Sequence, residues 1–345
     1  MLLWRKFKCK RSELRIDITL KCGQSFRWKL LPASATASKE SNIPENQSVF
    51  AGVLKDKLLL LSQDEENIWY HCVNNNKCDK TENLLKDYFQ LKVNLSKLYK
   101  EWSQKDPIFK EICKSFEGVR ILRQDPVENV FSFICSANNN ISRISGMVEK
   151  MCSTYGELVD TFEDEKFYSF PSVQSLCSSG VEEKLRELGF GYRAKYIHQS
   201  AKFITAHGGE SWLLNHRKMP YSDARKSLLQ LQGVGPKVAD CILLMSCDQP
   251  SAVPVDTHMF SIAKQYKPEL ARTKTVTDKV YQEVSQLFRD MYGDYAGWAH
   301  SVLFSADLKY FQKMDLEQVK LSNEVKTEED PESEPKQPSK KKRKK

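Results

Sequence analysis

Apolar and polar residues alternate with a period of two near the start of the chain, most clearly over residues 14–19. That spacing is typical of a strand with one buried face. Further short apolar segments between turn residues predict strands at 26–30, 49–54, 57–62 and 68–73. Residues 32–48 are rich in Ser, Ala, Asn and Pro and are predicted as a hairpin loop, and 74–77 as a turn. The first part of the chain therefore predicts an antiparallel sheet.

The period changes to that of helices from Thr81 onward. A strong helix start follows at Asp125, with Pro126 in the first turn and Glu128 three residues after the cap. More helices are predicted near 140–152, 181–188, 194–206, 221–231, 236–247, 257–266, 276–291 and 295–309. The predicted fold class is α+β: a sheet domain with flanking helices over 1–116, a helical domain over 117–321, and a disordered basic tail over 322–345.

The chain has a net charge of +8. The tail from residue 322 holds eight basic and six acidic residues, so +6 belongs to the rest. A basic body favours a polyanionic partner, although a modest excess of charge also serves solubility. No apolar run reaches the roughly 18 residues of a membrane span, so no membrane partner is expected.

Ten cysteines are scattered along the chain and none forms a C-x-x-C pair. Several lie in apolar helical patterns, as Cys135 does. This usage is typical of buried thiols in a reducing compartment rather than of a disulfide framework. The same scatter predicts no metal site.

The most informative segment is residues 231–241, where Gly233, Val234 and Gly235 separate two helical patterns. Glycines allow a tight turn, and Pro236 fits the first turn of the next helix. The three amides and that helix N-terminus together make a phosphate site. The segment has the helix-hairpin-helix pattern of sequence-independent DNA binding. A plain helix–helix turn with a glycine cap is the alternative.

Lys237 directly follows the hairpin, and Asp256 precedes a helix nineteen residues later. Taken alone, the lysine is a phosphate contact and the aspartate a helix cap. Together they suit a base-removing enzyme, because a neutral amine can attack the sugar C1′ and a carboxylate can stabilise the cationic sugar. Cys241 lies one turn after Lys237, either as a core thiol or on the same functional face.

The chain resembles the 8-oxoguanine DNA glycosylases of the helix-hairpin-helix/GPD superfamily from about residue 12 to 310. The resemblance rests on separated motifs: Gly-Gln-Ser-Phe-Arg-Trp at 23–28, Leu-Arg-Gln-Asp-Pro at 122–126, Phe-Ser-Phe-Ile-Cys at 131–135, Ser-Ala-Asn-Asn-Asn-Ile-Ser-Arg at 136–143, Gly-Tyr-Arg-Ala at 191–194, the hairpin, residues 253–258 and Tyr-Ala-Gly-Trp at 295–298.

The resemblance implies a chemistry for the pocket. Lys237 would attack C1′ and form a Schiff base that permits strand cleavage, with Asp256 supporting base loss. The carbonyl of Gly23 would accept the N7 hydrogen that oxidised guanine has and guanine lacks, a bond worth roughly 1–3 kcal/mol when buried. Phe304 and Cys241 would sandwich the flipped base, and Met245 would line the pocket.

The resemblance also implies contacts to duplex DNA that contains oxidised guanine. Asn138 would fill the gap left by the flipped base, and Tyr192 would wedge the stack. Arg143 and Arg193 would read the orphaned cytosine. His258 would contact a phosphate near the lesion.

Two features depart from or limit the resemblance. His300 stands where the family usually has a Gln that binds the pairing edge of the base; a neutral imidazole also offers a donor and an acceptor, and it adds a dependence on pH. No cysteine follows Cys247, so the four thiolates of an iron–sulfur cluster are unavailable there. This argues against the adenine-excising and pyrimidine-excising relatives.

The interpretation is therefore a bifunctional DNA glycosylase and lyase, expected to act as a monomer and to need no organic cofactor. Backbone carbonyls of Leu229, Leu231 and Val234 could bind a monovalent cation at the hairpin. The alternatives are a non-enzymatic DNA clamp and an alkylpurine glycosylase that uses water. The Lys-rich segment 340–345 predicts nuclear import, and the basic N-terminus could serve as a mitochondrial presequence.

Overall fold

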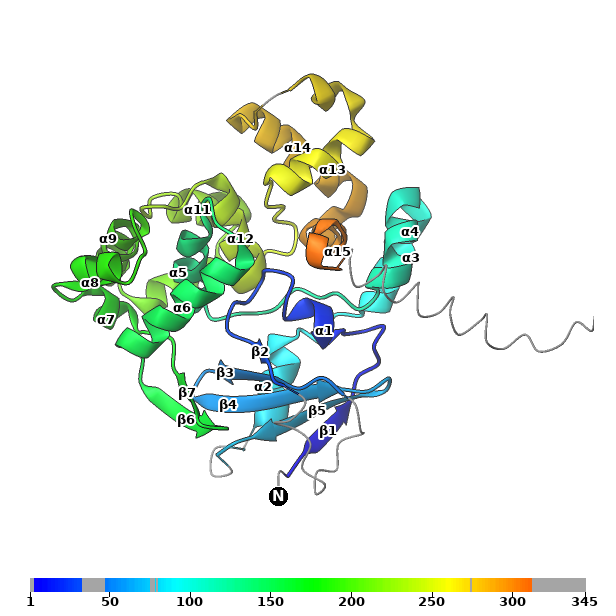
Figure 1. Ribbon diagram of the computed structural model, residues 1–345. Coiled ribbons are helices and arrows are strands. Elements are labelled where there is room, and N and C mark those ends of the chain that lie inside the picture. Colours follow the sequence, from blue (N-terminus) through cyan, green and yellow to red (C-terminus); the bar gives the residue numbers. More distant parts are fainter. Residues whose placement is uncertain (1–2, 33–46, 75–77, 79, 274, 312–345) are drawn as a thin grey trace, which may run out of the picture.

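The computed structural model describes residues 3–32, 47–74, 78, 80–273 and 275–311. Its largest sheet has five antiparallel strands in the order β1-β5-β4-β3-β2. Figure 1 shows this sheet below the helices, with the helical part above it. The strands are β1 (Arg5–Lys8), β2 (Lys29–Leu30), β3 (Phe50–Leu54), β4 (Lys57–Gln63) and β5 (Asn67–Cys72).

The rest of the chain is mostly helical, which confirms the predicted α+β class. A second small sheet pairs β6 (Leu158–Phe162) with β7 (Glu165–Tyr168). The helices are α1 (Ile16–Thr19), α2 (Thr81–Tyr88), α3 (Leu95–Lys105), α4 (Pro107–Phe116), α5 (Pro126–Ser136), α6 (Ile141–Tyr155), α7 (Val173–Cys177), α8 (Val181–Glu187), α9 (Arg193–Ala206), α10 (Glu210–Asn215), α11 (Tyr221–Leu228), α12 (Pro236–Ser246), α13 (Thr257–Tyr266), α14 (Asp278–Tyr292) and α15 (Ala296–Asp307). Among the described residues, no helix is long and apolar enough to cross a membrane.

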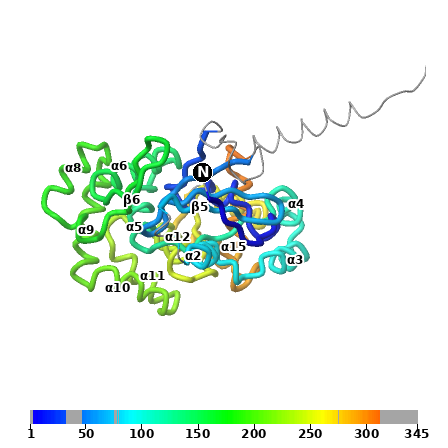
Figure 2. The backbone as a smooth tube through the Cα atoms, turned by 90° about the horizontal axis from the view of Figure 1, so that it is seen from below, coloured from blue at the N-terminus to red at the C-terminus, as the bar shows by residue number. Residues whose placement is uncertain are grey.

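Helices α12 and α15 lie near the centre of the molecule (Figure 2). Helices α6, α8 and α9 lie to one side of them, and α3 and α4 to the other. The central helices are apolar on nearly every face, which is expected of helices buried on all sides. This placement brings the start of α12 and the middle of α15 to one site.

The sheet buries both of its faces. Phe50, Leu59 and Leu61 on one face pack with side chains of α1 and α2, including Ile16 and Leu85. The opposite face packs against the β6–β7 hairpin, whose Phe167 lies in a separate apolar cluster with strand residues. A segment from the helical half of the chain therefore completes the core of the sheet.

The strand predicted over residues 14–19 is wrong, because Ile16–Thr19 forms a single helical turn. The alternating pattern has another cause: Ile16 packs against the sheet, whereas Ile18 packs in the main helical core. The strand predicted over 26–30 shrinks to Lys29–Leu30. Phe26 instead enters the helical core, where its ring makes an edge contact with Phe133 at 5.7 Å.

The strands predicted at 49–54, 57–62 and 68–73 are confirmed within a residue at each end. The basic N-terminal segment forms the edge strand β1, which the pattern did not predict, and the β6–β7 hairpin was not predicted either. Most of the predicted loop at 32–48, much of the turn at 74–77 and the whole tail from 322 lie outside the described residues.

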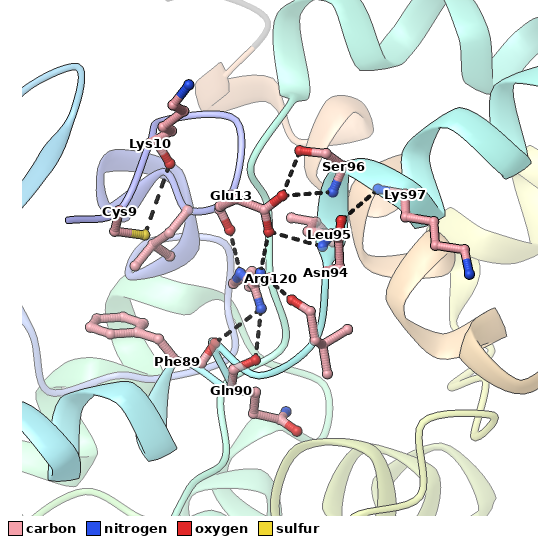
Figure 3. A network of polar contacts seen from close by, with 12 residues as sticks. Cys9, Lys10, Glu13, Phe89, Gln90, Asn94, Leu95, Ser96, Lys97 and Arg120 are labelled. Carbon is pink, nitrogen blue, oxygen red and sulfur yellow. Dashed lines mark hydrogen bonds and ion pairs between the residues drawn. The ribbon is translucent and has the colours of Figure 1, made fainter.

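Arg120 and Glu13 join the N-terminal segment to the helical part (Figure 3). The Arg120 guanidinium is fully buried and lies 2.7 Å from the Glu13 carboxylate. It also donates to the carbonyls of Gln90 at 2.8 Å and Val93 at 2.6 Å. Glu13 in turn accepts from the amide of Leu95 at 2.9 Å, at the start of α3. One ion pair therefore holds three segments that are distant in sequence against one another: those around Glu13, around Arg120, and from Gln90 to Leu95.

The helix start predicted at Asp125 is confirmed. The Asp125 carboxylate accepts from the amides of Val127 at 2.8 Å and Glu128 at 3.3 Å, and Pro126 opens α5. Glu128 has a separate contact, because its carboxylate pairs with Arg27 at 3.0 Å. This pair ties α5 to the segment that leads into the sheet.

Candidate active site

A cavity with about 390 Å³ of free space, counted to its open mouth, lies between α12, α15 and the loop that contains Gly23. It brings together residues far apart in sequence. Its lining consists of Cys22, Gly23, Gln24, Phe133, Lys237, Cys241, Met245, Pro254, Asp256, His300, Ser301 and Phe304. Every residue that the sequence predicted for catalysis or base binding is in this set.

Lys237 and Asp256 face the same cavity from the starts of two helices. Lys237 is the second residue of α12, and its amine lies 5.2 Å from the centre of the Phe133 ring. Asp256 caps α13 by accepting from the Met259 amide at 3.0 Å, which confirms the predicted cap. Both side chains are half-buried, so each is accessible from the cavity mouth. The site therefore combines an amine with a carboxylate whose position is set by a helix N-terminus.

Gly23 lines the opposite wall, with a φ of +82° in the left-handed region that favours glycine. A Cβ there would also crowd the Ile141 side chain at 3.2 Å. The neighbouring Gln24 fixes the loop, since its side chain donates to the Arg120 carbonyl at 2.7 Å and accepts from the Leu122 amide at 2.9 Å. The backbone of Gly23 is thereby presented at a defined place.

Cys241, Met245 and Phe304 supply an apolar surface within the cavity. Cys241 and Met245 are buried on α12, whereas Phe304 is partly exposed on α15. Burial raises the pKa of the Cys241 thiol to about 11, against a smaller opposing effect of Lys237. The thiol is therefore neutral at pH 7, where it packs as a soft apolar group. A flat aromatic ligand would find suitable surfaces here.

His300 also lines the cavity and is buried. Within the described residues, neither ring nitrogen of His300 has a partner at hydrogen-bond geometry. The nearby backbone of Pro254 and Gly297 nevertheless acts to raise the pKa of the imidazole. Burial lowers the pKa of His300 to about 4, against the attraction of nearby Asp256. The imidazole is therefore neutral at physiological pH and offers one donor and one acceptor.

A wider groove, with about 1980 Å³ of free space, opens onto the cavity and shares Gly23, Phe133, Lys237, Asp256 and Phe304 with it. The groove also runs past the hairpin glycines, Asn138 and His258. Its size and its position at two helix N-termini suit an extended anionic chain. The cavity is thus a side pocket of a groove.

The hairpin predicted between α11 and α12 is confirmed. Gly233 has a φ of +80°, and a Cβ there would approach Tyr196 to 2.7 Å. Val234 buries its side chain and donates its amide to the Leu231 carbonyl at 3.2 Å. The predicted phosphate contact of Val234 therefore competes with an internal bond. Gly235, at the cap of α12, faces open space.

The residues predicted to enter the duplex gather around one loop. Asn138 is exposed in the groove with a φ of +48°. Tyr192 is 47% exposed and donates to the Ala137 carbonyl at 3.2 Å. Arg193 is instead buried, with its guanidinium bonded to the carbonyls of Ala137 and Asn138. Arg143 is exposed in the first turn of α6.

His258 lies at the edge of the groove and pairs with Asp307 at 2.5 Å. Its ring also makes an edge contact with Phe304, with centroids 5.7 Å apart. Asp307 is a site residue that the sequence analysis missed, and no local spacing links residues 258 and 307. Gln24 was missed too, although it lies within a motif noted for the resemblance.

Comparison with known proteins identifies the family of the chain. Residues 6–130 match the 8-oxoguanine DNA glycosylase N-terminal domain, and residues 131–290 match the HhH-GPD superfamily of base excision DNA repair proteins. The chain is 39% identical to the N-glycosylase/DNA lyase OGG1 of Arabidopsis thaliana over 88% of this chain and 80% of that one. It is 36% identical to an N-glycosylase/DNA lyase of Saccharomyces cerevisiae over 88% and 86%.

A solved structure agrees as well. The 8-oxoguanine glycosylase/lyase of Clostridium acetobutylicum, in complex with double-stranded DNA containing cytosine opposite 8-oxoguanine, aligns with a TM-score of 0.71. The alignment covers 91% of this chain and 98% of that one at 26% identity. These matches define the class of the protein as a base-excision DNA repair enzyme with a helix-hairpin-helix fold.

Within that class, the chain belongs to the 8-oxoguanine DNA glycosylase family. It is a bifunctional DNA N-glycosylase and lyase for apurinic or apyrimidinic sites. The fold, the hairpin and the groove that opens onto the cavity are those that a base-removing enzyme needs.

Proposed function

We propose that the protein removes 8-oxoguanine paired with cytosine from duplex DNA, and that it cleaves the strand through a Schiff base on Lys237. The observation that carries the proposal is the joint lining of one cavity by the Lys237 amine, the Asp256 carboxylate and the backbone of Gly23. The cavity opens onto the groove that contains the hairpin, so a base flipped out of a bound duplex has a place to enter.

The proposed reaction uses side chains of this chain. The neutral amine of Lys237 attacks C1′, the N-glycosidic bond breaks, and the base departs with the bonding electrons. Asp256 stabilises the positive charge that develops on the sugar. One proton of the attacking amine passes to the departing base, and the second passes to O4′ as the sugar ring opens to an imine between Lys237 and C1′. Transfer of a C2′ proton to water then expels the 3′ phosphate by β-elimination. Water finally releases the lysine.

Several groups that line the cavity would distinguish 8-oxoguanine from guanine and other bases. The Gly23 carbonyl would accept the N7 hydrogen of 8-oxoguanine, which guanine does not have. Phe304 and Cys241 would cover the two faces of the ring, and Met245 would contact its edge. His300 would form hydrogen bonds with the pairing edge of the base through one donor and one acceptor nitrogen.

Discrimination of the partner base is assigned to Arg143 and Arg193. Arg143 is exposed and has its donors available. Arg193 would first exchange its bonds to Ala137 and Asn138 for bonds to cytosine, which couples reading of the partner to movement of the Asn138 loop. Asn138 would then fill the space left by the flipped base.

Borohydride trapping tests the proposal, because borohydride reduces an imine to a stable covalent link. Wild-type protein and an 8-oxoguanine:cytosine duplex should give a trapped complex, and Lys237→Gln should give none while it still binds the duplex. Lys97→Gln is the matched control, since Lys97 is 73% exposed on α3 and pairs there with Glu101. It should trap as well as wild type.

Three results would overturn the proposal. Trapping that persists in Lys237→Gln would assign the nucleophile to another residue. Base release without any trapped complex in wild type would favour water as the nucleophile, as in an alkylpurine glycosylase. Binding without base release would indicate a DNA clamp.

A further inference from the structure

A buried carboxylate connects the helices around the active site. Asp240 lies on α12, three residues after Lys237, and is fully buried. It accepts from the Tyr221 hydroxyl of α11 at 2.7 Å and from the Arg225 guanidinium at 3.3 Å. Its second oxygen accepts from the hydroxyl of Tyr281, which comes from α14. Helices α11, α12 and α14 therefore meet at one buried carboxyl group.

Tyr281 extends this connection to the segment before Asp256. Its oxygen accepts from the Val255 amide at 3.3 Å and lies 3.2 Å from the Pro236 carbonyl. Pro236 immediately precedes Lys237, and Val255 immediately precedes Asp256. One phenolic oxygen thus contacts the backbone next to both proposed catalytic residues.

A second bond on the same helix face supports this arrangement. Ser285 lies one turn after Tyr281 on α14 and donates to the Val253 carbonyl at 3.1 Å. The segment before Asp256 is consequently attached to α14 at two points. Helix α12 has its attachment to α14 through Asp240 and Tyr281.

We propose that Tyr281 is a positioning residue that sets the separation between the Lys237 amine and the Asp256 carboxylate. This inference rests on the proposed function of those two residues. Neither Tyr281 nor Asp240 is among the described residues that line the cavity, so neither acts on the substrate directly. Base excision depends steeply on geometry, because the amine and the carboxylate must act on the same sugar at once.

Tyr281→Phe tests the proposal, since it keeps the ring and removes only the shared oxygen. The single-turnover rate of excision should fall roughly tenfold, and the rate of borohydride trapping should fall by the same factor. Affinity for a duplex with an uncleavable 2′-fluoro lesion should stay within about twofold, because the groove is unchanged. A loss in the chemical step at constant binding is the signature of positioning.

Two matched controls separate positioning from general stability. Tyr221→Phe removes a hydroxyl donor from the same carboxylate but leaves the contact between Tyr281 and Val255. Tyr266→Phe removes a comparable bond, 2.7 Å to the buried carboxylate of Asp106, away from the cavity. Both controls should excise at nearly the wild-type rate at a temperature where all proteins are folded.

Three outcomes would overturn the proposal: a wild-type rate in Tyr281→Phe, an equal loss in a control, or a loss confined to binding. Should Tyr281→Phe not fold, Asp240→Asn provides the second variant, because its amide offers one acceptor oxygen to three donors. It should show the same loss of rate at constant affinity, and a wild-type rate would again overturn the proposal. Lys237→Gln, run in parallel, reports separately on the nucleophile.

Discussion

The imidazole of His300 and the ring of Phe304 lie stacked, with their planes 10° apart and their centroids 6.1 Å apart. Both residues are on α15, one turn apart, and both line the cavity. A base packed on Phe304 would therefore lie roughly parallel to the imidazole, so that its edge could meet the ring nitrogens. These nitrogens are buried and make no hydrogen bond among the described residues. Each therefore carries an unfavourable desolvation free energy until a ligand forms a hydrogen bond with it.

The first prediction concerns the pH dependence of His300→Gln. Because burial lowers the pKa of His300 to about 4, the imidazole is neutral throughout the range from pH 5.5 to 8. Single-turnover rates of wild type and His300→Gln should therefore run parallel in that range. They should diverge only as the pH falls towards 4, where protonation of wild type turns the acceptor nitrogen into a donor. Stopped reactions on an 8-oxoguanine:cytosine duplex provide the rates.

Divergence that already begins near pH 6.5 would contradict this prediction. It would mean that the imidazole titrates like an exposed histidine. Identical absolute rates at every pH would instead show that His300 has no contact with the base. Lesion recognition would then depend on Gly23, Phe304 and Cys241.

The second prediction concerns the partner base. Excision opposite cytosine should exceed excision opposite adenine, and Arg143→Gln should reduce that ratio. On its pairing edge cytosine presents two adjacent acceptors, N3 and O2, to the exposed guanidinium, whereas adenine presents a single acceptor, N1, beside a donor. A good bidentate contact is worth about 1–3 kcal/mol. Arg5→Gln is the control, because Arg5 is exposed on the edge strand β1. A ratio that Arg143→Gln leaves unchanged would assign partner reading to another side chain.

The third prediction concerns the Glu13–Arg120 ion pair. Breaking a buried pair costs about 3–5 kcal/mol, and because the Glu13 side chain is 28% exposed, we expect a loss of about 2 kcal/mol in Glu13→Gln. Urea unfolding at pH 7 measures this loss. Glu111→Gln is the control, since its pair with Lys114 is exposed on both sides and should contribute little.

The same variant has a predicted pH dependence. Burial raises the pKa of Glu13, but hydrogen bonds from Ser96 and Leu95 and the charge of Arg120 together lower it below the usual 4.5. The stabilisation by Glu13 is therefore complete above about pH 4.5 and is lost as the pH falls through the lowered value. The stability difference between wild type and Glu13→Gln should shrink on acidification, and a constant difference would contradict the role of the charge.

The fourth prediction concerns location. Deletion of residues 336–345 should reduce nuclear accumulation while excision on short duplexes stays nearly intact, because these residues follow the family-matched region. Replacement of residues 340–345 by serines should have the same effect as the deletion. Unchanged nuclear import in both variants would show that the import signal lies elsewhere.

The sequence pattern was sufficient to predict features that depend only on neighbouring residues, such as turns, helix caps and strands. The glycines of the hairpin, the caps at Asp125 and Asp256 and three of the strands were predicted from turn chemistry and periodicity. The pattern failed at Ile16 and Ile18, since alternation also arises when neighbouring side chains enter two separate cores. Long-range contacts such as His258 with Asp307 leave no trace in local spacing.

The residues of the candidate site also divide into those that their own sequence surroundings predict and those that they do not. Lys237 and Asp256 could be proposed from their chemistry and their helix starts, whereas Gly23, His300 and Phe304 depended on the resemblance. The bonds of Arg193 to the Asn138 loop could not be predicted, because they depend on how α9 packs beside α5. Tyr281 gave no signal at all, since its role comes from a contact between α14 and two other segments.

The covering of one sheet face by the β6–β7 hairpin has a consequence for synthesis of the chain. Strand residues such as Ala51 and Leu60 share their apolar cluster with Phe167, more than 100 positions later in the sequence. While the ribosome is still translating the intervening helices, the described residues of that face lack the cover that Phe167 later supplies. A chain truncated at residue 130, where the first family match ends, should therefore be prone to aggregate through this face.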